Sequence, residues 1–90
     1  MYMVIGEQRL PAAGPEERRA QFAHMAEVVR RSPGFVHGWW GPDEADQDTG
    51  HALVLLDTRE HALEFAATVE RFVTGLRLRV MAVDVTVNAP

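Results

Sequence analysis

The 90-residue sequence contains no cysteine and no lysine, and it contains a single serine, Ser32. The missing cysteine excludes disulfides, thiolate metal sites and a thiol nucleophile. The missing lysine excludes a Schiff base and the phosphate-binding ammonium of a P-loop. Ser32 directly precedes Pro33 at the expected end of a helix, which suits a turn better than a nucleophile. Covalent catalysis is therefore not expected.

Charge and hydropathy also narrow the choice of partner. The formal net charge is −4, and the nine cationic residues are arginines scattered along the chain, so no basic stripe for phosphates is formed. No apolar run approaches the ~20 residues that cross a bilayer, and no leading basic-plus-apolar segment is present. We predict a cytoplasmic protein that binds neither nucleic acid nor membrane.

The hydrophobic periodicity predicts six elements in the order strand, helix, strand, strand, helix, strand. Strands are expected at 2–10, 35–40, 51–56 and 78–87. The first helix begins at Glu16 and is stopped by Pro33-Gly34. The second is capped by Asp57 or Thr58 and stops at Gly75. The polar segment 41–50 is expected to be a solvated hairpin loop.

This order predicts one α+β domain over residues 1–90, with a ferredoxin-like βαββαβ fold. Its four-stranded antiparallel sheet carries both helices on one face. A chain of this length buries only ~60–65% of its unfolded surface, and the last two strands lack the polar alternation of a sheet with one wet face. We therefore expect a second copy to cover the other face, giving a homodimer.

Two short motifs, Ser32-Pro33-Gly34-Phe35 and Asp57-Thr58-Arg59-Glu60-His61-Ala62, resemble the antibiotic biosynthesis monooxygenase-like family of the dimeric α+β barrel superfamily. The match in element order covers 2–87. The resemblance implies a small cofactor-independent monooxygenase that acts on an aromatic, polyketide-type substrate in secondary metabolism. Many members, including haem-degrading ones, carry a tryptophan where this chain has Leu56-Asp57, which argues against haem degradation.

A second resemblance leaves the reaction open. Trp40-Gly41 followed by His51-Ala52-Leu53-Val54 is similar to stress-response A/B barrel proteins, which include polyketide cyclases. The histidine usual on the first strand of that family is missing here. The sequence favours an enzyme that binds a small hydrophobic aromatic ligand, with a polyketide cyclase or a non-catalytic homodimeric ligand-binding or accessory protein as alternatives.

The second strand holds the main candidates for catalysis. If Trp40 pairs opposite His51, then His37 and Trp39 share one face of the sheet with Ala52, Val54 and Leu56, while Trp40 and His51 share the other with Leu53 and Leu55. We interpret His37 as a general base near pH 7 and Trp39 as a stacking surface or an oxyanion donor. The alternative is that Trp39 fills the core or the dimer interface.

The remaining candidates are scattered. Trp40 and His51 are interpreted as substrate-binding residues or as an exposed rim, and His61 as a side chain at the flank of the second helix's apolar stripe, positioned to look into a cavity. Asp84 interrupts the most apolar strand, so it is a catalytic carboxylate, an exposed group or an ion-pair partner of an arginine such as Arg9. Arg79 either binds a substrate anion or ends the strand in solvent.

Metals and cofactors are not expected. The four histidines show no paired spacing of the kind that holds a metal. His24 falls opposite the apolar stripe of the first helix and is expected to lie in solvent.

Overall fold

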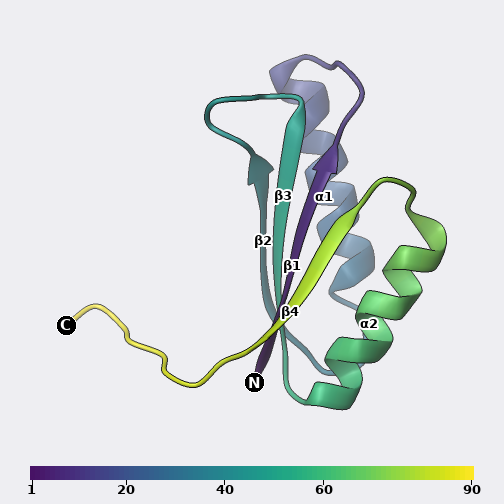
Figure 1. Ribbon diagram of the computed structural model, residues 1–90. Helices are drawn as coiled ribbons and strands as arrows, with labels where there is room; N and C mark the ends of the chain where they lie inside the picture. Colours follow the sequence, from purple (N-terminus) through teal and green to yellow (C-terminus); the bar gives the residue numbers. More distant parts are fainter.

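A computed structural model describes residues 1–90 and contains the six predicted elements in the predicted order (Figure 1). They are β1 (Tyr2–Arg9), α1 (Pro15–Val29), β2 (Phe35–Pro42), β3 (Thr49–Leu56), α2 (Arg59–Phe72) and β4 (Arg77–Ala82). Neither helix has the length and apolar character to cross a membrane.

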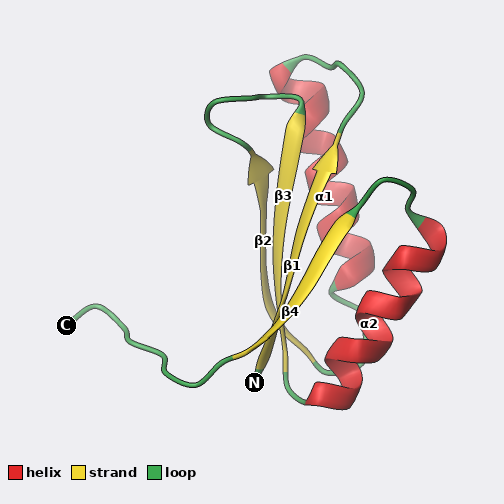
Figure 2. Cartoon of the chain, viewed as in Figure 1, coloured by secondary structure: helices red, strands yellow, loops and turns green.

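The four strands form one antiparallel sheet in the order β2-β3-β1-β4, so β2 and β4 are its free edges. Both helices cover the same side of this sheet (Figure 2). We call this side the helix face and the opposite side the open face. The predicted α+β, ferredoxin-like fold is confirmed.

The core lies between α2 and the middle of the sheet. Val4 of β1, Val54 and Leu56 of β3, and Ala62 and Ala66 of α2 form one buried cluster. The small alanine side chains let α2 approach the sheet closely. By contrast, the backbone of α1 lies close to β2 alone, although its side chains Phe22 and Val29 reach Gly50 of β3 and the core cluster. The backbones of the two helices stay apart. Space therefore remains between them above the sheet.

The residues predicted to cap or stop the helices lie at the helix ends or a few residues beyond them. The side chain of Thr58 accepts a hydrogen bond from the backbone N–H of His61 at 3.1 Å, so Thr58, not Asp57, caps α2. Gly34 and Gly75 follow the two helices with φ of +79° and +75°, the left-handed conformation that favours glycine.

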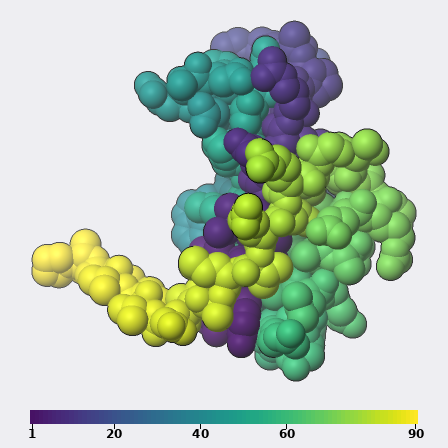
Figure 3. All heavy atoms as spheres, in the orientation of Figure 1, coloured from purple at the N-terminus to yellow at the C-terminus, as the bar shows by residue number.

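The last strand is shorter than the sequence predicts, because no strand of the sheet pairs with residues 84–87. β4 ends at Ala82, which pairs with Tyr2 at the start of β1, and one more bond joins the N–H of Val83 to the carbonyl of Met1 at 3.0 Å. Residues 83–90 continue as an extended tail, which stands clear of the body from Asp84 onward (Figure 3). The predicted strand over 78–87 was therefore wrong beyond Ala82.

The pairing of β2 with β3 also differs from the prediction. Trp40 lies opposite Ala52, not opposite His51. The register shifts just before His37, where Val36 is an extra residue in β2, as in a β-bulge. Side chains after the bulge therefore point to the opposite face from the one expected.

This shift corrects the predicted grouping of side chains. His37 and Trp39 lie on the open face, paired with Leu55 and Leu53 respectively, and not with the residues of the helix face. Trp40 lies on the helix face. The two adjacent tryptophans therefore serve opposite sides of the sheet.

Candidate functional site

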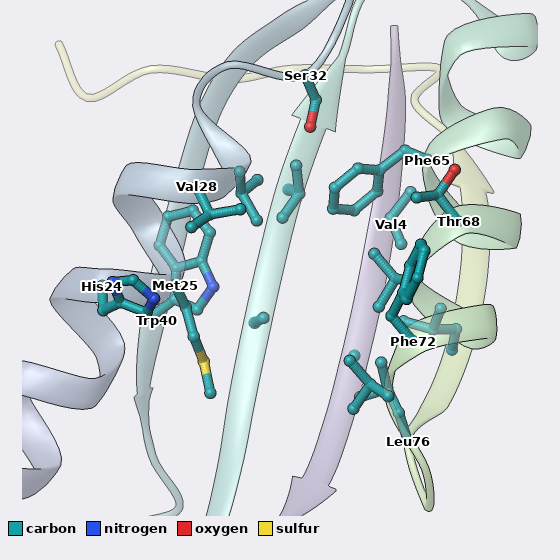
Figure 4. Close-up of a pocket in the computed structure, with 17 residues that line it drawn as sticks. Val4, His24, Met25, Val28, Ser32, Trp40, Phe65, Thr68, Phe72 and Leu76 are labelled. Atoms are coloured by element: carbon teal, nitrogen blue, oxygen red, sulfur yellow. The ribbon is translucent and has the colours of Figure 1, made fainter.

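A cavity of about 360 Å³ lies between α1, α2 and the helix face of the sheet (Figure 4). Seventeen residues line it, and 13 of them are hydrophobic. Phe65 and Phe72 come from α2, Met25 and Val28 from α1, and Trp40 from β2. A lining of this kind suits an apolar, aromatic ligand.

Short side chains on the sheet make room for this cavity. Gly6 and Ala52, which pair across β1 and β3, both line it. On β2 the indole of Trp40 lies over Gly38, where a Cβ atom would overlap its ring. The sequence therefore places one large flat side chain beside two small ones, and α1 and α2 do not meet above them.

Four of the residues that line the cavity carry a polar atom in their side chain. They are the imidazole of His24, the hydroxyls of Ser32 and Thr68, and the indole N–H of Trp40. His24 and Trp40 lie on the side of α1 and β2, whereas Thr68 lies across the cavity on α2 (Figure 4). Of these four, His24 alone carries an imidazole, the side chain that serves most often as a general base.

Sequence reasoning missed His24. It was expected in solvent, opposite the apolar stripe of α1, and its side chain is indeed exposed, but it also lines the cavity. The stripe argument assumes that the helix lies flat on the middle of the sheet, whereas the backbone of α1 approaches only the edge strand β2, and α1 borders the cavity along its side. The neighbouring Met25 is the one local signal that this flank is apolar.

Among the predicted substrate-binding residues, Trp40 lines the cavity. The predicted pair His37 and Trp39 stays together, with ring centroids 4.5 Å apart and planes tilted by 47°, but it stands on the open face. Trp39 is 48% exposed there. The roles of His37 as a base and Trp39 as a stacking surface remain predictions, and both require a ligand that reaches the open face.

Arg79 and His51 also lie on the open face. Arg79 pairs with Ile5, so one row across the sheet reads Trp39, Leu53, Ile5, Arg79. His51 contacts Asp43 at 2.7 Å, and this hydrogen bond lowers the pKa of the Asp43 carboxyl. The pair fixes the start of the 43–48 loop to β3, so His51 anchors this loop.

Asp84 lies in the exposed tail beyond β4. This agrees with the alternative that Asp84 is an exposed group. The alternative ion pair with Arg9 is not formed, and Arg9 contacts Asp46 of the hairpin loop at 2.9 Å instead. Asp84 is therefore neither in the cavity nor in the sheet. No three acidic or histidine side chains gather as a metal ion would require.

His61 does not line this cavity, but it lines a second, more polar pocket of about 400 Å³ that shares Ser32, Phe65 and Thr68 with it. Its Nδ1 contacts Asp57 Oδ1 at 2.7 Å, and Gly34 lies beneath this pair, where any Cβ atom would overlap both side chains. The backbone N–H of Asp57 also donates to the carbonyl of Gly34 at 2.9 Å. The two motifs that carry the family resemblance therefore meet and join the turn after α1 to the start of α2.

The hydrogen bond to Asp57 raises the pKa of His61, and the same bond lowers the pKa of Asp57. The contribution of His61 to stability is present below its ordinary value of 6.5 and is lost as pH rises through its raised pKa. The contribution of Asp57 is present above its ordinary value of 3.8 and is lost as pH falls through its lowered pKa. The pair is thus most effective between about pH 4 and 6.5.

We expect the free energy of unfolding of the wild-type protein to fall from pH 6 to pH 8.5, and His61→Ala to remove part of this fall. Urea titrations at several pH values measure it. Asp57→Asn should flatten the same region, since it removes the partner that raises the pKa of His61. A full wild-type slope in both variants would contradict this assignment.

No protein-family profile and no curated protein sequence matches this chain. Solved structures do match. A Deinococcus radiodurans protein provisionally named an antibiotic biosynthesis monooxygenase superposes with a TM-score of 0.69 at 14% identity, over 100% of this chain and 99% of that one. A variant of SnoaB, a cofactor-independent oxygenase from Streptomyces nogalater, gives 0.68 at 19% identity, over 98% and 97%.

A haem-degrading protein from Mycobacterium tuberculosis also superposes, with a TM-score of 0.66 at 22% identity, over 98% of this chain and 96% of that one. These matches extend over nearly whole chains, but at identities that establish architecture only. The chain therefore has the ferredoxin-like fold of the antibiotic biosynthesis monooxygenase structures.

Proposed function

We propose that this protein is a small cofactor-independent monooxygenase-like enzyme for a flat, apolar aromatic substrate of polyketide type. The observation that carries the proposal is the cavity of about 360 Å³, with its apolar walls and few polar groups. Such a site binds an aromatic ring system by burial and orients it with a small number of hydrogen bonds. The structural neighbours named as oxygenases support the same kind of chemistry.

The chemistry needs one base and a dry, polarised site. A base removes a proton from an acidic C–H of the substrate, and a hydrogen-bond donor stabilises the resulting enolate. The enolate gives its electrons to dioxygen and forms a C–O bond, and the peroxide takes the proton back. Loss of water, with cleavage of the O–O bond, then leaves a ketone. The balance is CH₂ plus O₂ to C=O plus H₂O.

The geometry supports His24 as the base and Trp40 as the donor. His24 carries the one imidazole in the lining, the group that serves most often as a general base, and Trp40 contributes an indole N–H that has no role in the sheet. Ser32 and Thr68 supply hydroxyls at other points of the wall. The cavity is far more apolar than polar, which strengthens these interactions.

Haem does not fit this lining. Haem carries two propionates, and no arginine lines the cavity to pair with them. His24 and Met25 are the two iron-binding side chain types in the lining, and both come from exposed or half-buried positions of α1. The proposed reaction therefore does not use haem.

We propose further that the protein works as a homodimer, as the apolar open face indicates. Its cytoplasmic location remains a prediction. Six apolar side chains lie together on that face: Met3, Ile5, Trp39, Leu53, Leu55 and Met81. Trp39, Leu53 and Met81 remain 37–48% exposed in one copy. A contiguous apolar surface of this kind is typical of an interface.

The test is turnover of a tricyclic hydroxyanthrone, followed by oxygen uptake and by the absorbance of the quinone product. We expect His24→Gln to lower kcat by about 10²–10⁴-fold, the usual contribution of a general base, with the dissociation constant little changed. Binding is followed separately by quenching of Trp40 fluorescence in a Trp39→Phe background.

His37→Gln is the matched control, because it removes the same ring from the open face. If His37→Gln stops turnover and His24→Gln does not, the site lies on the open face and the assignment to the cavity is wrong. If the probe binds but neither the wild-type protein nor a variant consumes oxygen, the non-catalytic ligand-binding alternative holds. A ring-closed product formed without oxygen uptake would favour the cyclase.

A further inference from the structure

Beyond the hydrogen bond of Val83 to Met1, the C-terminal tail has no strand partner, and its side chains from Asp84 onward are exposed. Val83, Val85 and Val87 alternate with Asp84, Thr86 and Asn88, which is the period of a half-buried β-strand. Yet Val85 is 79% exposed and Val87 is 86% exposed. The tail therefore has the pattern of a strand but lacks a surface to cover, and it leaves the body on the side away from α2 (Figure 1).

A shallow groove on the outer flank of the molecule has the complementary shape and chemistry. It has a volume of about 430 Å³ and runs between α1 and the start of β2, the free edge strand. Its lining includes Ala26, Phe35 and Val36, and Val36 is 46% exposed at the bulge. An edge strand with exposed apolar side chains is a ready surface for an added segment.

We propose that the tail of one copy lies in the α1–β2 groove of a second copy. This inference rests on the homodimer proposed above and specifies its geometry. If the two open faces meet with the two-fold axis parallel to the strands, β4 of one copy lies over β2 of the other. The apolar rows then coincide, with Leu53 over the Ile5 position of the second copy and Leu55 over Met3.

The same geometry brings the tail to the groove. β4 leaves the sheet at Met81 and Ala82, and Met81 lies in the same row across the sheet as His37, near the start of β2. An axis parallel to the strands keeps both ends at the same level. The eight residues 83–90 span about 27 Å when extended, and face-to-face sheets lie about 10 Å apart. The tail can therefore cross over and still cover several groove residues.

Charge supports this placement and gives Asp84 a role. Arg30 lines the groove, and Arg30 and Arg31 both contact Glu27, at 3.2 and 3.3 Å, which leaves one positive charge in excess there. Asp84 brings a negative charge on the tail. Because Trp40 lines both the groove and the cavity, the docked tail would also support the outer side of the cavity wall.

An engineered disulfide tests the contact, because the chain has no cysteine of its own. We expect the double variant Val36→Cys, Val85→Cys to form a covalent dimer on mild oxidation, whereas Ala20→Cys, Val85→Cys, with Ala20 exposed elsewhere on α1, should not. A disulfide within one chain would show that the tail returns to its own groove and would overturn the proposal.

Sedimentation velocity separates this proposal from the dimer itself. The double variant Val85→Asp, Val87→Asp should weaken dimerisation by about 100-fold or more, since two valines in each of two tails lose their burial. The control Thr86→Asp, on the other side of the tail, should change the dimer affinity much less. A wild-type monomer at micromolar concentration would overturn both the dimer and the docked tail. A wild-type dimer that tolerates both aspartates would overturn the docked tail alone.

Discussion

Replacement of Ala52 by phenylalanine should abolish binding of an aromatic ligand while leaving the protein as stable as the wild type. Ala52 lies on the floor of the cavity, between Gly6 on β1 and Trp40 on β2. A phenyl ring at this position occupies the space that the ligand needs. We expect the dissociation constant to rise by at least about 100-fold, since the fit of a single methylene is already worth about 10–200-fold.

The stability of the same variant tests whether the cavity exists in solution. A large side chain forced into a packed core costs about 1–3 kcal/mol, whereas one that enters an empty apolar cavity gains burial without strain. We expect Ala52→Phe to keep or raise the melting temperature. A lower melting temperature together with intact ligand binding would mean that the ligand site lies elsewhere.

Ala20→Phe provides the control for this experiment. Ala20 is exposed on α1 and lines none of the described pockets, so the same ring should change neither binding nor stability by much. Comparable losses of affinity in the two variants would indicate a general effect of an added aromatic side chain, and would contradict the assignment of the cavity as the ligand site.

Much of the fold could be predicted because its signals are local. Pro33-Gly34, Thr58 and Gly75 mark helix ends through their own backbone or side-chain chemistry, and the structure has each helix end beside them. The limits of β4 are not local. The strand ends at Ala82, opposite Tyr2 at the start of β1, whereas the valines that follow still look like strand in sequence.

The candidate site was harder to predict, because it also depends on pairing between residues far apart in the sequence. The bulge at Val36 sits in a run of strand-forming residues and leaves no mark in the composition, yet it decides which tryptophan faces the cavity. A prediction that groups residues by alternation is correct for only one of the two possible registers. His24 could be found only once the gap between α1 and α2 was known.

The structure separates two surfaces that residue alternation alone does not distinguish, the cavity side and the open face of the sheet. The cavity side holds Trp40 with three other polar groups, whereas the open face holds Trp39 among apolar side chains that a second copy would cover. If the tail of that copy lies behind Trp40, the two surfaces are coupled, because the tail then supports the residue that forms the cavity wall. Ligand affinity should accordingly depend on protein concentration near the dimer dissociation constant.

The largest loss of stability is expected from Gly34→Ala. Gly34 has a φ of +79°, and an alanine Cβ would overlap both Asp57 Oδ1 and the His61 ring. The left-handed conformation alone costs about 1–2 kcal/mol, and the overlap adds about 1–3 kcal/mol. For a domain of this size each kcal/mol lowers the melting temperature by about 4–8 °C, so a drop of more than about 10 °C is expected in calorimetry.

Gly75→Ala is a matched control, because Gly75 has a φ of +75° and no atom lies within 4 Å of its would-be Cβ. It should show the conformational cost alone, about 1–2 kcal/mol. The difference between the two variants then measures the contact of Gly34 with Asp57 and His61. In the double variant Gly34→Ala, His61→Ala the overlap with the ring is removed, so part of this difference in stability should be recovered. Equal losses in the two single glycine variants would show that the turn does not press against α2.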